Sequence, residues 1–360
     1  LTANTTGAHN IALGSDALMA NTTANNNVAV GNYSLKANTT GHSNVAMGLN
    51  ALNDSTTASY NTAVGTYSMD KTTTGSNNVA VGYQALEQNT TAYQNTAVGV
   101  TALKSTTTGL DNTGVGFSAM FANTTGYNNT SVGRSALYAN TTGSQNTAIG
   151  RAALFANTTG VDNTAVGSGC LDSNTTGNDN VAVGRLALEF NTTADDNVAI
   201  GFLALRYNTT GADNVAMGSR ALGANTTGSN NIAIGSNALD ANTTASHGSA
   251  FGFSALSANT TAQDNSAFGA YALQSATTGA SNTAVGAASL QANTTGYNNV
   301  AVGKNALLAN TTAYNNTAVG FESLSANTTG SGSNTCIGYR SGRYITTGQD
   351  NVFVGMNTGG

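Results

Sequence analysis

The chain has 360 residues and a formal net charge of −5, and only 8% of its residues are charged. It lacks the basic footprint of a nucleic-acid-binding protein and any apolar run long enough to span a bilayer. We therefore expect no nucleic-acid partner and no membrane insertion within this segment.

One short stretch, Asn-Val-Ala-Val-Gly at 78–82, recurs in variant form from end to end. Its closing glycine falls at Gly14 and then at every 17th residue up to Gly320, and two more follow at Gly338 and Gly355. These 21 units indicate a repeat protein in which each unit leans on its neighbours. The sequence begins and ends inside a unit, which predicts a window cut from a longer protein.

Within a unit, an asparagine precedes the Val-Ala-Val core, and a leucine or methionine stands four residues past the glycine. Thr-Thr follows at positions eight and nine past the glycine in all 20 units that reach them. The core alternates with the period of a strand, and 17 residues are too few for the helix pairs of most helical repeats. The absence of proline suits uninterrupted strand pairing.

The sequence therefore predicts an all-β protein, a parallel β-solenoid of about 21 coils. Stacked at about 4.8 Å per coil, these would form a rod of roughly 100 Å. Regular coils are expected over 1–329, and variant coils of the same solenoid over 330–360, where one residue is added and Ser-Gly replaces Ala-Leu.

A column is the set of residues that occupy the same position in successive units. Substitutions within columns predict which columns are in contact. Gly114 and Phe353 stand in the alanine column of the strand, and each accompanies a change in the leucine column, at Met120 and Gly342. We expect these two columns to share one packed face, because cavities and overpacking both destabilise a core. The opposite strand face is also apolar and would meet a second sheet or another chain.

Glycines and variable positions have separate roles in this scheme. The glycine after the strand is expected to need a positive φ or to leave no room for a Cβ. The glycine after Thr-Thr is replaced by alanine in seven units, which indicates close packing at that position. The variable columns are expected to face water, and they hold Tyr33, Lys36, Asp70, Glu87, Tyr127, Arg206 and Tyr297 among others.

The unit at 78–86 with its following Asn-Thr-Thr, and the later form at 345–355, resemble the repeats of bacterial and phage tail-fibre-domain surface proteins. More distantly, the strand motif is similar to the head repeats of trimeric autotransporter adhesins, whose unit is shorter. The resemblance covers essentially the whole chain. It implies an extracellular, cell-surface or virion fibre, often a homotrimer, and it carries no catalytic residue to transfer.

Asn-Thr-Thr also matches the acceptor pattern for N-glycosylation. The competing interpretation is a structural ladder, because both threonines persist where the asparagine is lost, at Ser55, Thr72, Thr106, Ala276 and Ile345. Sugars on threonine are a further form of the modification hypothesis. The candidate glycosylation sites are Asn21, Asn38, Asn89, Asn123, Asn140, Asn157, Asn174, Asn191, Asn208, Asn225, Asn242, Asn259, Asn293, Asn310 and Asn327.

Residues suited to catalysis or metal binding are few and scattered. Cys170 and Cys336 lie about ten units apart and are predicted to be buried small side chains. The three histidines show no metal-ligand spacing, and no nucleophile-base pair is evident. We therefore expect no cofactor, no metal and no enzymatic activity.

Three functions remain open. The first is a structural shaft that provides reach, stiffness and multivalent adhesion. The second is a carbohydrate- or host-receptor-binding module, for which Phe121, Tyr138 and Phe155 form a candidate contact stripe one unit apart. The third is an ice-binding protein with a rank of threonines facing water, although adjacent threonines point to opposite faces, so that at most one rank is exposed.

Overall fold

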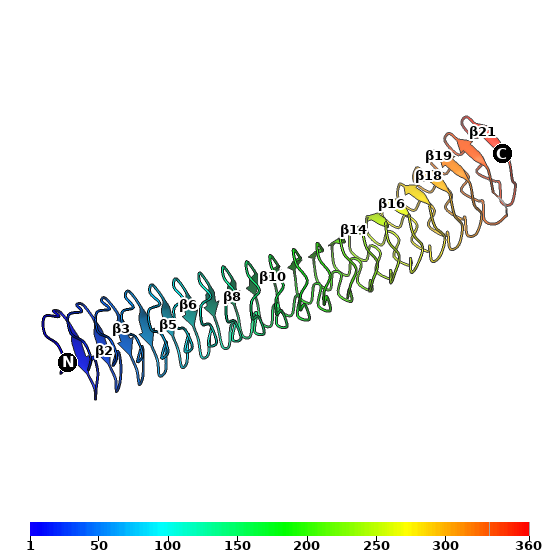
Figure 1. Cartoon of the computed structure of the whole chain (residues 1–360). Coiled ribbons are helices and arrows are strands. Elements are labelled where there is room, and N and C mark those ends of the chain that lie inside the picture. The colour runs from blue at the N-terminus through cyan, green and yellow to red at the C-terminus, as the bar shows by residue number, and fades with distance from the viewer. Residues whose placement is uncertain (331, 360) are drawn as a thin grey trace. The chain divides into compact units, whose positions relative to one another are not determined.

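The structure is a computed structural model that describes residues 1–330 and 332–359. It divides into two compact units, Leu1–Asp179 and Asn180–Gly360. Every regular element in the described residues is a strand of three residues, and within each unit successive strands lie one coil apart (Figure 1). The expected change of repeat type at residue 330 falls inside the second unit and stays a prediction. The inserted Ser331 lies outside the described residues.

The strands of the two units recur at the same column of the sequence repeat. In the first unit they are β1 (Ile11–Leu13), β2 (Val28–Val30), β3 (Val45–Met47), β4 (Thr62–Val64), β5 (Val79–Val81), β6 (Thr96–Val98), β7 (Thr113–Val115), β8 (Thr130–Val132), β9 (Thr147–Ile149) and β10 (Thr164–Val166). In the second unit they are β11 (Val181–Val183), β12 (Val198–Ile200), β13 (Val215–Met217), β14 (Ile232–Ile234), β15 (Ser249–Phe251), β16 (Ser266–Phe268), β17 (Thr283–Val285), β18 (Val300–Val302), β19 (Thr317–Val319), β20 (Thr335–Ile337) and β21 (Val352–Val354).

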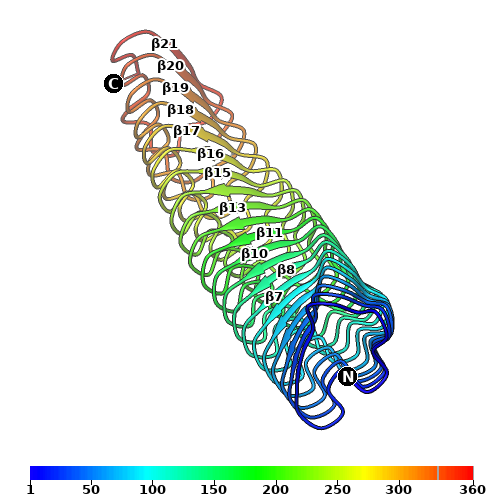
Figure 2. The same ribbon diagram turned by 90° about the vertical axis from the view of Figure 1, so that its left-hand side faces the viewer.

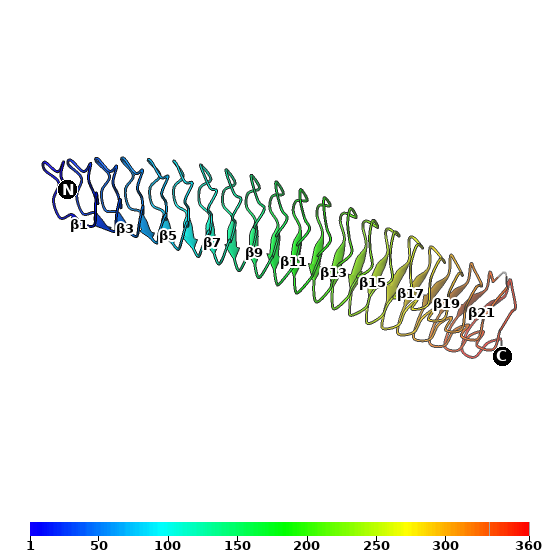
Figure 3. The ribbon, with the colours of Figure 1, turned by 90° about the horizontal axis from the view of Figure 1, so that it is seen from below.

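All pairings within each unit are parallel and join equivalent positions. Ala12 pairs with Ala29 and Ala182 pairs with Ala199, so that residues at the same position of the repeat lie side by side. The pairing of β19 with β20 keeps this alignment although 18 residues separate the partners. The coils of the first unit appear in Figure 2 as nested outlines of similar shape, each offset from the one before, and its strands line one side (Figure 3). The predicted all-β parallel solenoid with a 17-residue repeat is confirmed.

Backbone hydrogen bonds join the coils at the turns as well as at the strands. The N–H of Val28 donates to the carbonyl of Asn44 at 2.8 Å, and that of Gly31 donates back to Leu13 at 2.8 Å. In the turn after the strand, the N–H of Leu35 donates to Ala51 at 3.0 Å. Each coil therefore bonds to the coil before it and the coil after it around most of its circumference.

The turn after the strand contains left-handed residues that the sequence analysis did not predict. The second and fourth residues past the strand glycine have positive φ in almost every coil, as at Tyr33 (60°) and Leu35 (47°). Non-glycine residues seldom adopt this conformation. The N–H groups of these two left-handed residues donate in opposite directions along the stack, that of Tyr33 to Ser15 in the preceding coil and that of Leu35 to Ala51 in the following coil.

The interior is built from the alanine and leucine columns, as predicted. The central strand residue and the leucine are almost all fully buried, as at Ala97 and Leu103. A Cβ built on Gly114 would lie 3.1 Å from Cγ of Leu103 in the coil before, which confirms that the two columns pack together. The side chain nearest to the position of this Cβ is thus the leucine of the preceding coil.

The glycine that ends the strand satisfies both expected conditions. Gly133 has a φ of 137°, and a Cβ on it would lie 2.5 Å from the carbonyl oxygen of Gly150. The glycine after Thr-Thr is tight for another reason. A Cβ on Gly143 would meet the carbonyl of Gly160 and the side chain of Asn140, yet no positive φ is recorded there.

We predict that Gly133→Ala destabilises the first unit by roughly 2–4 kcal/mol, because it combines a strained φ with a clash against backbone. Gly143→Ala is the matched control and should cost less, since alanine occupies its column in seven other coils. Urea unfolding followed by circular dichroism checks both variants. Equal losses of stability would contradict this explanation.

Candidate functional site

The asparagines of Asn-Thr-Thr form a buried ladder along each unit. Nδ2 of Asn140 donates to Oδ1 of Asn123 at 3.0 Å and to the carbonyl of Gly143 at 2.9 Å. All fifteen candidate glycosylation asparagines have at most 1% of their surface exposed. A glycan on Nδ2 would replace one of these two donors and would need space that the neighbouring coils fill. The structure therefore favours the ladder interpretation.

A second asparagine column precedes the strand. The N–H of Asn44 donates to Oδ1 of Asn27 at 2.9 Å, and Nδ2 of Asn44 donates to the carbonyl of Ala58 at 2.8 Å. Each side chain thus links three successive coils. These buried amides satisfy the groups that a tightly wound backbone leaves without partners.

The ladder of Asn-Thr-Thr has gaps where another residue replaces asparagine. Nδ2 of Asn89 still finds the hydroxyl of Thr72 at 3.3 Å. Ala276 offers no donor, and Oδ1 of Asn259 in the coil before it is buried without a hydrogen-bond partner. Oδ1 of Asn38, in the coil before Ser55, is also buried without a hydrogen-bond partner.

We predict that Ala276→Asn stabilises the second unit by about 1 kcal/mol, because the new Nδ2 would donate to the buried Oδ1 of Asn259. Ser275→Asn, one residue earlier in the chain, is the control and should have little effect. Chemical denaturation of the two variants beside the native protein provides the measurement. A loss of stability in Ala276→Asn would refute the ladder argument.

The two threonines of each coil differ in environment. The first is half-buried in most coils and bonds along the stack, as when Oγ1 of Thr39 donates to the carbonyl of Thr56 at 3.0 Å. The second, Thr40 in that coil, is exposed, and so are its equivalents throughout the described residues. Only one rank of threonines therefore faces water.

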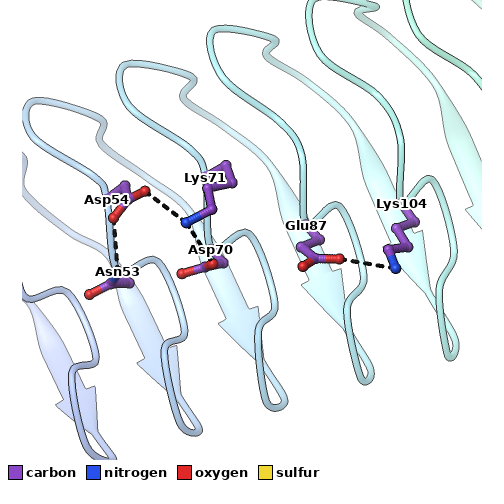
Figure 4. Close-up of polar contacts among 6 residues, drawn as sticks. All are labelled: Asn53, Asp54, Asp70, Lys71, Glu87 and Lys104. Carbon is purple, nitrogen blue, oxygen red and sulfur yellow. Dashed lines mark hydrogen bonds and ion pairs between the residues drawn. The ribbon is translucent and has the colours of Figure 1, made fainter.

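Charged residues on neighbouring coils of the first unit form two separate groups of ion pairs (Figure 4). Nζ of Lys71 lies 3.1 Å from Asp54 and 3.1 Å from Asp70, and Nζ of Lys104 lies 3.3 Å from Glu87. Asp70 was expected to face water, but only 6% of its surface is exposed. The expectation was wrong because the side chain lies along the column instead of projecting from it.

Burial has a consequence for the acidity of Asp70. Desolvation raises the pKa of its carboxyl above the ordinary value of 3.8, and the ammonium of Lys71 only partly opposes this. One of its oxygens, Oδ1, is buried without a hydrogen-bond partner. The charged carboxylate is therefore less stable in the folded protein than in water.

Asp70→Asn should change the pH dependence of stability. Since the folded carboxyl has the higher pKa, the free energy of unfolding of the native protein falls as pH rises from about 3.8 through that raised pKa. The variant lacks this titration, so its stability relative to the native protein should increase over the same window and then level off. Urea midpoints measured from about pH 3 to about pH 7 check this. Asp54→Asn, which also removes a partner of Lys71, is the control, and parallel curves for Asp70→Asn and native protein would disprove the prediction.

The predicted contact stripe is brought together in the first unit. The rings of Phe121 and Tyr138 stack with centroids 5.2 Å apart and planes 7° apart, and Tyr138 and Phe155 stack at 5.2 Å and 9°. Phe155 at one end is 37% exposed, and the ammonium of Lys104 lies 5.9 Å from the ring of Phe121 at the other. The stripe is thus a continuous aromatic stack, and its role in binding stays a prediction.

Sequence reasoning missed a second cluster, which lies in the second unit. It surrounds a surface hollow of about 370 Å³, formed where Gly223 replaces the larger side chains of its column. The signal was present in the sequence, because within the regular coils this column otherwise holds residues with a side chain. The lining residues are Leu203, Arg206, Tyr207, Arg220, Gly223, Ala224, Asp240 and Ala241.

The two cysteines lie far apart in the sequence and are buried. Cys170 and Cys336 are buried and unpaired, as predicted for small core side chains. Burial raises the pKa of the Cys170 thiol to about 12 and that of Cys336 to about 11, so both remain protonated at neutral pH. Across 1–330 and 332–359, no cluster of His, Cys, Asp or Glu could hold a metal ion. In the same residues no helix has the length and apolarity needed to cross a membrane.

Comparison of the chain with protein-family models and with curated proteins gives no match.

Proposed function

We propose that the chain is a structural shaft segment of an extracellular fibre, on a cell surface or a virion, that supplies reach and stiffness. The observation that carries the proposal is the continuity of its ladders. Backbone, asparagine and threonine hydrogen bonds run from coil to coil within each unit. A load along such a stack is shared by many equivalent bonds, which suits a mechanical role and requires no catalytic residue.

We further propose that the shaft self-associates, most simply as a homotrimer. The strand face that points away from the core supports this part of the proposal. In β5 the flanking residues Val79 and Val81 are 38% and 37% exposed, while Ala80 between them is buried. Equivalent valines, isoleucines and methionines recur one coil apart, so a second copy with the same spacing could match them coil for coil.

A carbohydrate- or receptor-binding role is the second candidate, favoured by the stack of Phe121, Tyr138 and Phe155. Flat aromatic rings at regular spacing offer repeated weak contacts, which multivalency strengthens. Ice binding has less support, because the single exposed threonine rank is flanked by the half-buried first threonine and by buried glycine or alanine. A one-residue-wide rank makes no broad flat array.

Negative-stain imaging and native mass spectrometry test the shaft proposal together. We expect elongated particles, and a native mass that is a multiple of the 35.9 kDa chain without added glycan mass. A monomeric mass would reject self-association while leaving the shaft in place. Compact globular particles would reject the shaft itself.

A further inference from the structure

The hollow at Gly223 results from one missing side chain in an otherwise filled column. The corresponding residues of the two preceding coils are Glu189 and Arg206, and that of the following coil is Asp240. A Cβ built on Gly223 would lie 2.8 Å from Oδ1 of Asp240, so the carboxylate leans over the vacant place. The hollow of about 370 Å³ has the size of a small-ligand site.

One side of the hollow offers an aromatic surface. Tyr207 stacks on Phe190 in the preceding coil, with centroids 5.4 Å apart and planes 6° apart. The next residue in this column is Ala224, which is too small to cover the other face of the ring. Tyr207 is accordingly 47% exposed and lines the hollow.

Polar groups of both signs surround this ring. Nε of Arg206 donates to Glu189 at 2.5 Å and its Nη1 donates to the hydroxyl of Tyr207 at 3.1 Å, which fixes the guanidinium beside the ring. Arg220 and Asp240 also line the hollow, and within the described residues their side chains form no ion pair or hydrogen bond. Burial raises the pKa of the Asp240 carboxyl, and the charge of Arg220 opposes that rise.

We propose that the hollow at Gly223 binds one pyranose ring of a neutral glycan. The apolar face of a sugar ring would lie on Tyr207, and its hydroxyls would donate to Asp240 and accept from Arg220. The charges of the cluster cancel, with Arg206 against Glu189 and Arg220 against Asp240, so neither a polyanion nor a cation is favoured. This proposal is independent of the proposed shaft function, because a sugar site of this kind could also exist on a protein that is not a fibre. The two proposals can therefore fail separately.

Saturation-transfer NMR and calorimetry with the methyl pyranosides of glucose, galactose, mannose and N-acetylglucosamine test the site on the full chain. We expect at least one sugar to bind with a Kd of roughly millimolar, as suits a ligand of about a dozen non-hydrogen atoms. Failure of all four to bind would overturn the proposal. So would binding of inorganic phosphate without binding of any sugar, which would assign the hollow to anions.

The repeat supplies variants that the fold already accepts. Gly223→Gln fills the hollow with a residue that occupies the same column at Gln274 and Gln291, and Tyr207→Ala introduces the residue found at Ala224. Each should weaken sugar binding at least about tenfold, since a pocket filled or stripped of its aromatic anchor loses its main contact. Ser257→Gln, in the same column away from the hollow, should leave binding unchanged.

Circular dichroism melts of each variant verify that the solenoid is intact. Sugar binding that survives Gly223→Gln in a folded protein would refute the site. A loss of binding in Phe121→Ser/Tyr138→Ser/Phe155→Ser, with Gly223→Gln unaffected, would move sugar recognition to the first unit and equally overturn the proposal.

Discussion

Hydrogen bonding along the stack is the constraint on which the rest of the structure depends. Each coil is too short to enclose a core or to satisfy its own backbone, so its N–H and carbonyl groups must find partners in the coils on either side. The parallel alignment of equivalent residues follows from this need. So do the two asparagine columns, whose amides complete the bonding where the chain turns too sharply for backbone alone, as Asn44 does between Asn27 and Ala58.

The same constraint explains the unusual interior. The core of a coil consists mostly of two alanines and one leucine, as at Ala97, Ala102 and Leu103, together with buried amides. An apolar core of this size cannot by itself offset the conformational entropy lost on folding. Polar groups inside must therefore be almost fully bonded, and some of the exceptions fall where the repeat is imperfect, as at Asn259 beside Ala276.

Much of this architecture could be predicted from the sequence, because equivalent positions in 21 units expose the role of each column. The strand, the shared face of alanine and leucine, and the strain at the strand glycine were all evident. The left-handed leucines were not, because leucine avoids this conformation when only local preference acts. Gly342 replaces leucine in this column and has a φ of 63°. Because glycine adopts the left-handed conformation readily, this replacement was a sign that the leucine column is left-handed.

The candidate sites were harder to predict for a related reason. A column that varies indicates exposure on average, yet neighbouring residues can cover a side chain in such a column, as happens to Asp70 beside Lys71. Aromatic residues one unit apart could be recognised as a stripe because neighbours in a column must be close. The hollow at Gly223 depends on an absent side chain and on how Asp240 fills part of the gap, and three-dimensional positions are needed to see that.

The close approach of successive strand glycines also limits how the gene can change. With a carbonyl of the next coil 2.5 Å from where a Cβ on Gly133 would lie, the coils cannot slip past one another by a single residue. One residue is added between Gly320 and Gly338, and β19 and β20 remain aligned across the addition. Recombination between the repeated DNA segments therefore preserves the fold when whole coils are gained or lost, and such events change the length of the protein in fixed steps.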